Sequence, residues 1–200
     1  MNFLRRPRWS LAAMLVVMTI FAAYFAYVER TARHQREAVS WVHRVGGFVR
    51  YDWQPSATDQ AGDPKFPPAP EILRRYLGDE PFQAVRSIGV GDPALDDIGP
   101  LATQGSVEML FVSSQYFTYD LQPISNLRKL ENLTLHAKEF DSLEPLINLP
   151  KLTYLEIRDT VIDDAVLDDF RQRRPDVMLI VTPPTSKREL SPGSRAVRNW

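Results

Sequence analysis

The sequence predicts an α/β fold: a short solenoid with a parallel sheet of about four to five strands, preceded by a transmembrane helix and an irregular capping region. The first observation behind this prediction is a repeat, because LQPISNLRKL at 121–130 recurs 22 residues later as LEPLINLPKL at 143–152. Both copies run into a short Leu-rich strand pattern. The second observation is an uncharged apolar run at 11–28, which is long enough to span a membrane.

The amino-terminal part divides into a basic segment at 1–9 and a transmembrane helix at 10–28. The eighteen uncharged residues 11–28 would form a helix of about 27 Å, close to a hydrocarbon core of about 30 Å. Three arginines and Trp9 precede the run, in positions typical of a membrane interface. A cleaved signal peptide is the alternative, since it shares the basic start. The run is longer than a usual signal-peptide core and no clean small-x-small site ends it, which favours a retained anchor.

The charges on the two sides of the apolar run predict which side of the membrane the rest of the chain occupies. Arg30, Arg33 and Arg36 follow the run and nearly balance the three arginines and the free amine before it. The small excess before the run favours a cytoplasmic amino terminus. We therefore expect a single-pass membrane protein with an extracytoplasmic repeat domain.

Residues 29–54 are expected to form a juxtamembrane helix and a short strand. The helix has one apolar stripe, made by Ala38, Val39, Trp41, Val42 and Val45. Gly46 and Gly47 end the helix where a left-handed cap is needed. Residues 48–53 are then predicted as the strand.

Five prolines make 55–70 a Pro-rich linker, because proline suits neither a central strand nor a helix interior. The repeat domain is assigned to 71–182. It begins with a short amphipathic helix at 71–77, which is followed by a glycine stop. We expect this helix and the 48–53 strand to cap the first strand of the repeats.

Four sets of strand residues recur inside the repeat domain at spacings of 22, 23 and 22 residues. They are Val85-Ile88-Val90, Val107-Leu110-Val112, Leu130-Leu133-Leu135 and Leu152-Leu155-Ile157. The segments between the strands keep the same register, at Ile98-Gly99-Pro100-Leu101, Leu121-Gln122-Pro123-Ile124 and Leu143-Glu144-Pro145-Leu146. A helix at 164–173 and a last strand at 177–181 close the far end. The tail at 183–200 is expected to be disordered.

One stretch carries a recognisable pattern, made by Leu149, Leu152, Leu155, Ile157, Thr160, Ile162, Asp163, Asp164 and Leu167. It resembles the repeats of bacterial leucine-rich repeat proteins. The segment GGFVRYDW at 46–53 follows a basic start and one apolar helix. In this it resembles short bacterial members that are anchored by one amino-terminal transmembrane helix. The resemblance implies a solenoid that displays a surface for recognition.

The chain departs from that family at the position three residues after each strand, which usually carries Asn or Cys. Here the position holds Pro93, Gln115, Lys138 and Thr160. We therefore expect irregular turns and no continuous asparagine ladder. The turn at 113–120 is one residue longer and rich in aromatic residues, which predicts a bulge there.

Side chains alternate between the two faces of a strand, so the residues between the buried positions should point outward. These residues form three rows across neighbouring strands. We predict a binding surface on the concave face, made by Met109, Phe111, Asn132, Thr134, His136, Tyr154, Glu156 and Arg158. Its mixture of apolar and polar side chains is typical of protein recognition. The alternative is a solvated sheet face on which Glu156 pairs across strands.

No catalytic residue, metal site or cofactor is predicted. His136 has no nucleophile motif close by, which favours a surface role. His34 and His43 lie too far apart along a helix to share a metal ion. Asp163 and Asp164 suit the start of a helix better than a calcium loop, because the twelve-residue calcium pattern is missing.

Charge and composition narrow the choice of partner. Residues 29–200 hold 21 basic and 25 acidic residues, a net charge of −4, which gives no electrostatic footprint for nucleic acid. The chain has no cysteine, which excludes disulfides and thiolate chemistry. Arg171, Arg173 and Arg174 could form a basic end that touches phosphates, although neighbouring acids dilute it.

We interpret the chain as a membrane-anchored, non-catalytic module for protein–protein or ligand recognition, with another protein as its partner and no small-molecule cofactor. No P-loop, dinucleotide motif, nucleophile elbow or metal box argues for an enzyme. The alternative is a structural subunit of a membrane or envelope complex. An open apolar patch at Met109, Phe111 and Tyr154 would favour recognition, whereas burial of that patch beneath 55–70 would favour the structural subunit.

Overall fold

The computed structural model describes residues 11–54, 69–79, 82–91, 97–114, 120–140 and 142–184. Several features predicted from the sequence lie outside these residues. They are the basic segment at 1–9, the linker at 55–68, the two turn positions Pro93 and Gln115, the aromatic bulge at 115–119 and the tail from 185 onward.

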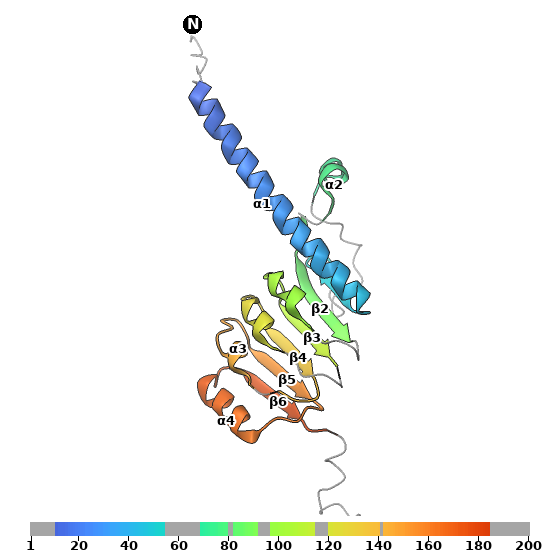
Figure 1. Cartoon of the computed structure of the whole chain (residues 1–200), viewed down its shortest axis with the longest axis vertical. Coiled ribbons are helices and arrows are strands. Elements are labelled where there is room, and N and C mark those ends of the chain that lie inside the picture. The colour runs from blue at the N-terminus through green and yellow to red at the C-terminus, as the bar shows by residue number, and fades with distance from the viewer. Residues whose placement is uncertain are drawn as a thin grey trace, which may run out of the picture.

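The chain alternates helices and strands, as an α/β fold does (Figure 1). The helices are α1 Leu11–Arg44, α2 Glu71–Leu77, α3 Glu144–Ile147 and α4 Asp164–Arg173, with two 3₁₀ helices, η2 Gly99–Thr103 and η3 Gln122–Asn126. The strands are β1 Phe48–Tyr51, β2 Val85–Gly91, β3 Met109–Ser113, β4 Asn132–His136, β5 Tyr154–Arg158 and β6 Met178–Thr182. All six strands form one sheet in the order β1 to β6.

Strands β2 to β6 pair in parallel, one step at a time along the chain. The sheet therefore contains five parallel strands plus β1, which pairs antiparallel with β2. The β1 strand ends before the predicted limit of 53, because Asp52 and Trp53 form a turn. In that turn the Asp52 carboxylate accepts a hydrogen bond from the Ala84 N–H at 3.2 Å.

The pairing register follows the repeat in the sequence. Leu110, Leu133 and Leu155 lie opposite one another on three neighbouring strands, and all three are buried. The ladder begins one residue before the strands, since the Glu131 N–H donates to the Glu108 carbonyl at 2.8 Å. Each repeat of one strand, one short helix and their turns therefore places its strand beside the previous one.

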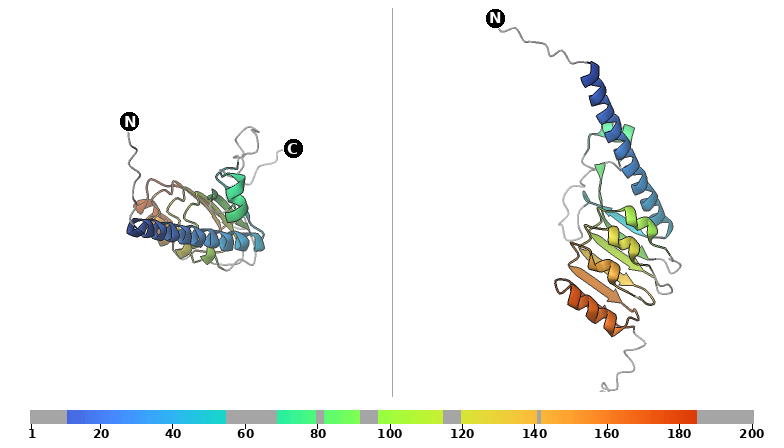
Figure 2. Two further views of the ribbon diagram at one scale, coloured as in Figure 1. Left: turned by 90° about the horizontal axis from the view of Figure 1, so that it is seen from above. Right: turned by 60° about the vertical axis from the view of Figure 1, so that its left-hand side comes forward.

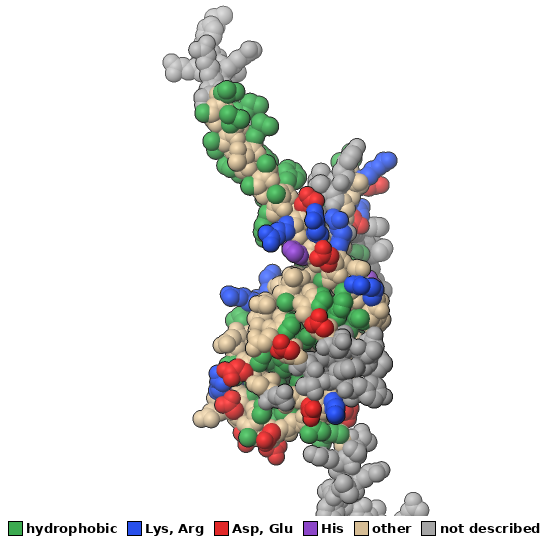
Figure 3. Space-filling view, in the orientation of Figure 1, with side chains coloured by type: hydrophobic (Ala, Val, Ile, Leu, Met, Phe, Trp, Pro, Cys, Tyr) green, Lys and Arg blue, Asp and Glu red, His purple; other side chains and the backbone are tan. Residues whose placement is uncertain are grey.

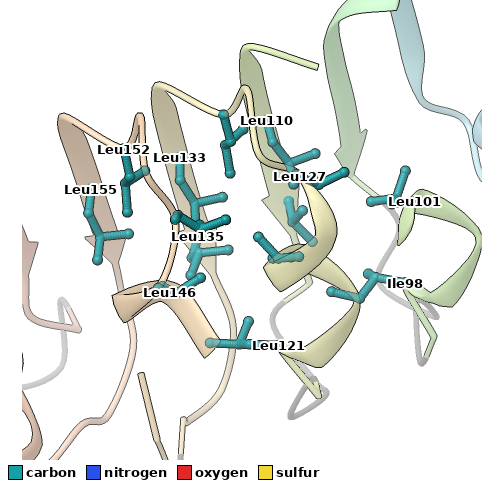
Figure 4. Close-up of a cluster of buried hydrophobic side chains, with 14 of the residues drawn as sticks. Ile98, Leu101, Leu110, Leu121, Leu127, Leu133, Leu135, Leu146, Leu152 and Leu155 are labelled. Atoms are coloured by element: carbon teal, nitrogen blue, oxygen red, sulfur yellow. The ribbon is translucent and has the colours of Figure 1, made fainter. Parts of the chain in front are cut away.

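Short helices return the chain from one strand to the next along one face of the sheet (Figure 1, Figure 2). Each of η2, η3 and α3 has a proline in its first turn, at Pro100, Pro123 and Pro145, where the helix needs no backbone N–H. The apolar residues of these segments are buried: Ile98, Leu101, Leu121, Ile124, Leu143 and Leu146. All six belong to the same core as the strand leucines, and Figure 4 shows Ile98, Leu101, Leu121 and Leu146 among them. The predicted equivalence of the three segments is confirmed.

Helix α1 runs without a break from the apolar run into the predicted juxtamembrane helix (Figure 1). Most side chains of its first half are exposed, whereas Ala32, Ala38 and Val42 are buried. Val42 belongs to the core of the repeats, and the rest of the predicted stripe (Val39, Trp41 and Val45) packs against that core. The helix ends at Arg44, and Gly46 two residues further on has a φ of 68°, which is left-handed as predicted.

The first strand of the repeats is covered by a different helix from the one predicted. The α2 helix has the predicted bounds but lies away from the strands in Figure 1. Helix α1 packs at this end instead, whereas the predicted place of the β1 strand beside the first strand is confirmed. Two hydrogen bonds fasten α1 there, from the Gln104 side chain to the His34 carbonyl at 3.4 Å and from Gln35 to the Gln83 carbonyl at 3.1 Å. The apolar stripe of α1 supplies the buried surface that this end of the core requires.

The far end of the sheet is closed by α4 and β6. The predicted bounds of α4 are confirmed, and Leu167 and Phe170 are its buried residues. The Asp163 carboxylate accepts from the Ala165 N–H at 3.0 Å, which confirms the predicted role of Asp163 as a helix cap. The β6 strand forms the edge of the sheet farthest from α1 (Figure 1).

Candidate functional site

The eight residues of the predicted surface lie on one face of the sheet, which we call the open face. It comprises the side chains of β2 to β6 that alternate with the buried ones. Its three rows are Ser87, Met109, Asn132, Tyr154, Met178; Gly89, Phe111, Thr134, Glu156, Ile180; and Gly91, Ser113, His136, Arg158, Thr182. The register of the three predicted rows is confirmed. The β6 members were not part of the predicted surface, although the sequence had placed a last strand there.

The apolar part of the open face is accessible. Phe111 is 36% exposed, and Met109 on the same strand and Tyr154 two strands away are half-buried. Met178 is 61% exposed and extends this part to the far edge of the sheet. Ile180 lies beside Glu156 in the next row.

Strand β1 adds a further aromatic side chain that the sequence had not suggested. Phe48 pairs with Gly89 and is 55% exposed. A Cβ atom at Gly89 would collide with the Phe48 ring, so the glycine makes room for this ring on the open face. Phe48 and Phe111 therefore flank the glycine on the two strands that pair with β2. The signal for this contact is the glycine in the middle of a strand, which marks a close approach.

A charged network runs along β5. The Arg158 guanidinium donates to both carboxylate oxygens of Glu156, at 2.7 and 2.9 Å, and the Tyr154 hydroxyl donates to the same carboxylate at 3.2 Å. Glu156 therefore pairs mainly along its own strand, and Thr134 adds a hydrogen bond from the neighbouring strand. Pairing across strands, the predicted alternative, accounts for only this last contact.

This network changes the ionisation of its members. Hydrogen bonds from Arg158 are the main cause that holds the pKa of Glu156 below its usual value, against an opposing effect of burial. Burial and the charge of Glu156 raise the pKa of Tyr154. The Glu156 carboxylate also raises the pKa of Arg158. At neutral pH the open face thus presents a compensated Glu–Arg pair and a neutral phenol.

His136 has closer partners than the sequence suggested. The Ser113 hydroxyl lies 3.2 Å from its Nδ1 atom, and the Asp159 carboxylate lies 3.9 Å from its Nε2 atom. No nucleophile motif is near His136 in the sequence, and the parallel register is what brings the Ser113 hydroxyl beside it. The Asp159 contact is too long for a hydrogen bond. A hydrolytic triad has its carboxylate hydrogen-bonded to the histidine, and these three groups do not form that chain.

The turn position that usually carries Asn or Cys is filled by Thr160 in the last repeat. Thr160 is buried, and its hydroxyl accepts from the Ala137 N–H at 3.3 Å and donates to the Arg158 carbonyl at 2.7 Å. The equivalent Lys138 is exposed. In this turn, the threonine hydroxyl thus makes hydrogen bonds to backbone groups in place of an asparagine side chain.

The predicted basic end is neutralised within the fold. Arg171 pairs with Asp168 at 2.8 Å, and Arg173 lies within 3.5 Å of both Glu144 and Asp169. The third arginine, Arg174, is largely buried and donates to backbone carbonyls. These contacts compensate the charge of the three arginines that the structure describes at this end.

Within the described ranges no group of three or more His, Asp or Glu side chains could hold a metal ion. His34 lies 3.8 Å from Glu37 on α1, and His43 lies more than two turns further along the helix. Helix α1 is long and apolar enough to cross a membrane, judged by length and composition. A signal sequence would meet the same test.

The geometry defines a repeat module with one accessible sheet face. No protein-family model matches the chain, and no curated protein matches it. Among solved structures it is similar to an internalin from Listeria monocytogenes, with 26% identity and a TM-score of 0.42 over 50% of this chain and 28% of that one. A second Listeria monocytogenes protein, internalin C2, gives 26% identity and a TM-score of 0.36 over 44% of this chain and 37% of that one. The chain spans well under half the length of both.

Proposed function

We propose that this chain is a membrane-anchored leucine-rich repeat module, a short solenoid whose open face recognises another protein without catalysing a reaction. Helix α1 would hold the module at a membrane, with the repeats on the extracytoplasmic side. The observation that carries the proposal is the alignment of the three rows on one face, with accessible apolar side chains among them.

The composition of the open face supports recognition of a protein. Phe111, Met178 and Phe48 offer exposed apolar area, and Tyr154 combines an aromatic ring with a hydroxyl. Aromatic and methionine side chains are enriched in protein interfaces, and aromatic rings bury much area at low entropic cost. The fixed Glu156–Arg158 pair supplies directional polar groups beside them.

Photocrosslinking in intact membranes tests this proposal. We would place a photoreactive amino acid at position 111 and a matched one at Gln122, which is exposed on the opposite side of the module. The proposal expects a specific crosslinked protein from position 111 that is missing from position 122. If position 111 yields no specific adduct, or both positions yield the same one, the open face is not the recognition surface.

A structural subunit remains the second candidate, and the far edge of the sheet favours it. Strand β6 has the uncharged sequence MLIVT and ends the sheet, and a sheet edge of this kind can accept a strand from another chain. A photoreactive group at Met178 distinguishes the two candidates. One stoichiometric partner captured at Met178 and none at Phe111 would favour the structural subunit.

A further inference from the structure

A second site lies where the last turns of α1 meet strand β1. An open pocket of about 610 Å³ is formed there by the last turns of α1, by Tyr51 of β1 and by Gln83. None of its described lining residues belongs to the three rows of the open face. Figure 3 shows Lys and Arg side chains, with Asp and Glu side chains among them, where α1 meets the rest of the molecule.

The pocket carries positive charge and hydrogen-bond donors. Arg36, Ser40, His43 and Arg44 come from one side of α1, at spacings of three to four residues or adjacent. None of the described lining residues is acidic. The side chains of His43 and Arg44 have no hydrogen-bond or ion-pair partner within the described part of the chain. The Arg44 guanidinium and the His43 imidazole are therefore available at this pocket, and Arg36 lines it beside them.

The remaining wall of the pocket is fixed in place. The Gln83 side-chain oxygen accepts from the Trp53 indole N–H at 3.1 Å, so the Gln83 amide N–H₂ is the end available for donation. Tyr51 stacks on Trp53, with ring centroids 6.3 Å apart and planes 6° apart. The site thus combines cationic donors on the helix with an aromatic and amide wall that is already ordered.

We propose that this pocket binds a phosphate group, which Arg44, His43 and Ser40 hold by charge-assisted and neutral hydrogen bonds. Arginine matches the geometry of phosphate oxygens, and its charge strengthens each hydrogen bond. The proposal does not depend on recognition at the open face, because the two sites share no residue.

The phosphate could belong to a lipid head or to a soluble molecule. Arg36 lies eight residues and Arg44 sixteen residues beyond the apolar run, about 12 and 24 Å along the helix axis at about 1.5 Å per residue. The head-group layer on one side of a bilayer is roughly 5–8 Å thick. A lipid phosphate therefore reaches the pocket only if α1 tilts strongly, whereas a soluble phosphate reaches it directly.

The test uses the full chain in nanodiscs. Inorganic phosphate is titrated into nanodiscs of pure phosphatidylcholine, with chloride at equal ionic strength as the reference, and the shift in thermal unfolding gives the apparent affinity. In parallel, native mass spectrometry measures how much phosphatidylglycerol the protein retains from mixed nanodiscs. Each measurement is repeated with Arg44→Gln and with the control Arg33→Gln, which removes the same charge from α1 outside the pocket.

We expect Arg44→Gln to weaken binding about tenfold or more, as the loss of a charge-assisted hydrogen bond does, while Arg33→Gln stays near the native value. An effect in the phosphate titration identifies a soluble ligand, and an effect only on phosphatidylglycerol retention identifies a lipid. Equal losses for the two variants would reduce the effect to general charge and overturn the proposal, as would the absence of binding in both measurements. Arg44 is exposed, so the variant should fold, and its urea midpoint verifies this.

Discussion

At the residue scale, Arg174 shows how a largely buried charged side chain can stabilise a turn by donating hydrogen bonds to several backbone carbonyls. Its guanidinium, 11% exposed, donates to the carbonyls of Ile147, Leu149 and Leu152 at 2.9 to 3.0 Å and pairs with Asp176 at 2.9 Å. The Ile147 carbonyl is at the end of α3, where helix geometry leaves it without a partner, and Leu149 and Leu152 lie in the turn between α3 and β5. One arginine thus satisfies the turn of the last repeat.

Removing this guanidinium should cost stability. Arg174→Met keeps the aliphatic stem but leaves several carbonyls unsatisfied, so we expect the free energy of unfolding to fall by about 2–4 kcal/mol. Urea unfolding of the detergent-solubilised chain measures the change. The control is Arg171→Met, whose exposed pair with Asp168 should be worth no more than about 0.5 kcal/mol. Equal urea midpoints for the two variants would show that the hydrogen bonds of Arg174 do not stabilise the fold.

Glu156 leads to a prediction about pH. Its pKa is lower in the folded chain than in the unfolded chain, because Arg158 hydrogen-bonds the ionised form. The stabilisation is therefore fully present above the ordinary glutamate pKa of about 4.3 and is lost as pH falls through the lowered folded value. We expect the stability difference between the native chain and Glu156→Gln to be constant near pH 7 and to shrink below about pH 4.

The comparison is a series of urea midpoints between pH 2.5 and 7. Glu144→Gln is the matched control, because its carboxylate is exposed and lies 3.4 Å from Arg173. Its difference from the native chain should be small at every pH. A Glu156→Gln difference that grows as the pH falls would contradict the proposed direction.

At the element scale, α1 combines two environments in one helix. The outer half is apolar and exposed, and the inner half contributes Val42 to the core of the repeats. A chain that begins at Glu29 keeps the inner half, whereas a chain that begins at Gly46 loses it. We expect the longer form to fold and the shorter one to lose at least about 2 kcal/mol, since burial of one valine contributes about that much.

Far-UV circular dichroism during urea unfolding compares the two truncated forms. Val42→Asp in the longer form should reproduce much of the loss, because it buries an unpaired carboxylate. Arg33→Asp is its exposed counterpart and should change little. If the two truncated forms unfold at the same urea concentration, the inner half of α1 is dispensable for the fold.

Elements that depend on the repeat could be predicted from the sequence, and elements that depend on distant contacts could not. The period fixes the register, so the rows through Leu133 and Thr134 follow directly from the alternation of side chains. The packing of α1 over the first strand depends on the approach of two segments far apart in the chain. The repeat period carries no information about that approach. The prediction that the helix at 71–77, which is nearer in sequence, covers the first strand was therefore wrong.

The same distinction applies to the candidate site. Sequence alternation found Phe111, Tyr154 and Glu156, because each lies between buried strand residues. Phe48 was missed, since it reaches the open face from an antiparallel strand outside the repeat and over a glycine. The contact between His136 and Ser113 was also missed, although the two residues are neighbours in one predicted row.

At the scale of the whole molecule, the strands follow one another away from α1, so that β6 lies farthest from the apolar helix (Figure 1). If α1 spans a membrane with its amino terminus in the cytoplasm, the strands extend outward from that membrane. In the sequence, this orientation is favoured only by one extra positive charge before the apolar run.

Cysteine labelling tests the orientation, because the chain contains no cysteine of its own. Gln172→Cys places one thiol on the exposed face of α4. We expect a membrane-impermeant maleimide to label it in intact cells. Asn2→Cys, at the amino terminus, should react only after the cells are permeabilised. The reverse pattern would place the repeats in the cytoplasm.

The unbroken course of α1 has a mechanical consequence. The helix contains neither proline nor glycine from Leu11 to Arg44, the residues at which sharp kinks usually form, and it is about 51 Å long at about 1.5 Å per residue. Two hydrogen bonds and Val42 clamp its inner end to the repeats. The helix is therefore stiff and is fixed to the repeats at its inner end. A rotation or tilt of its outer half consequently rotates the open face by the same angle.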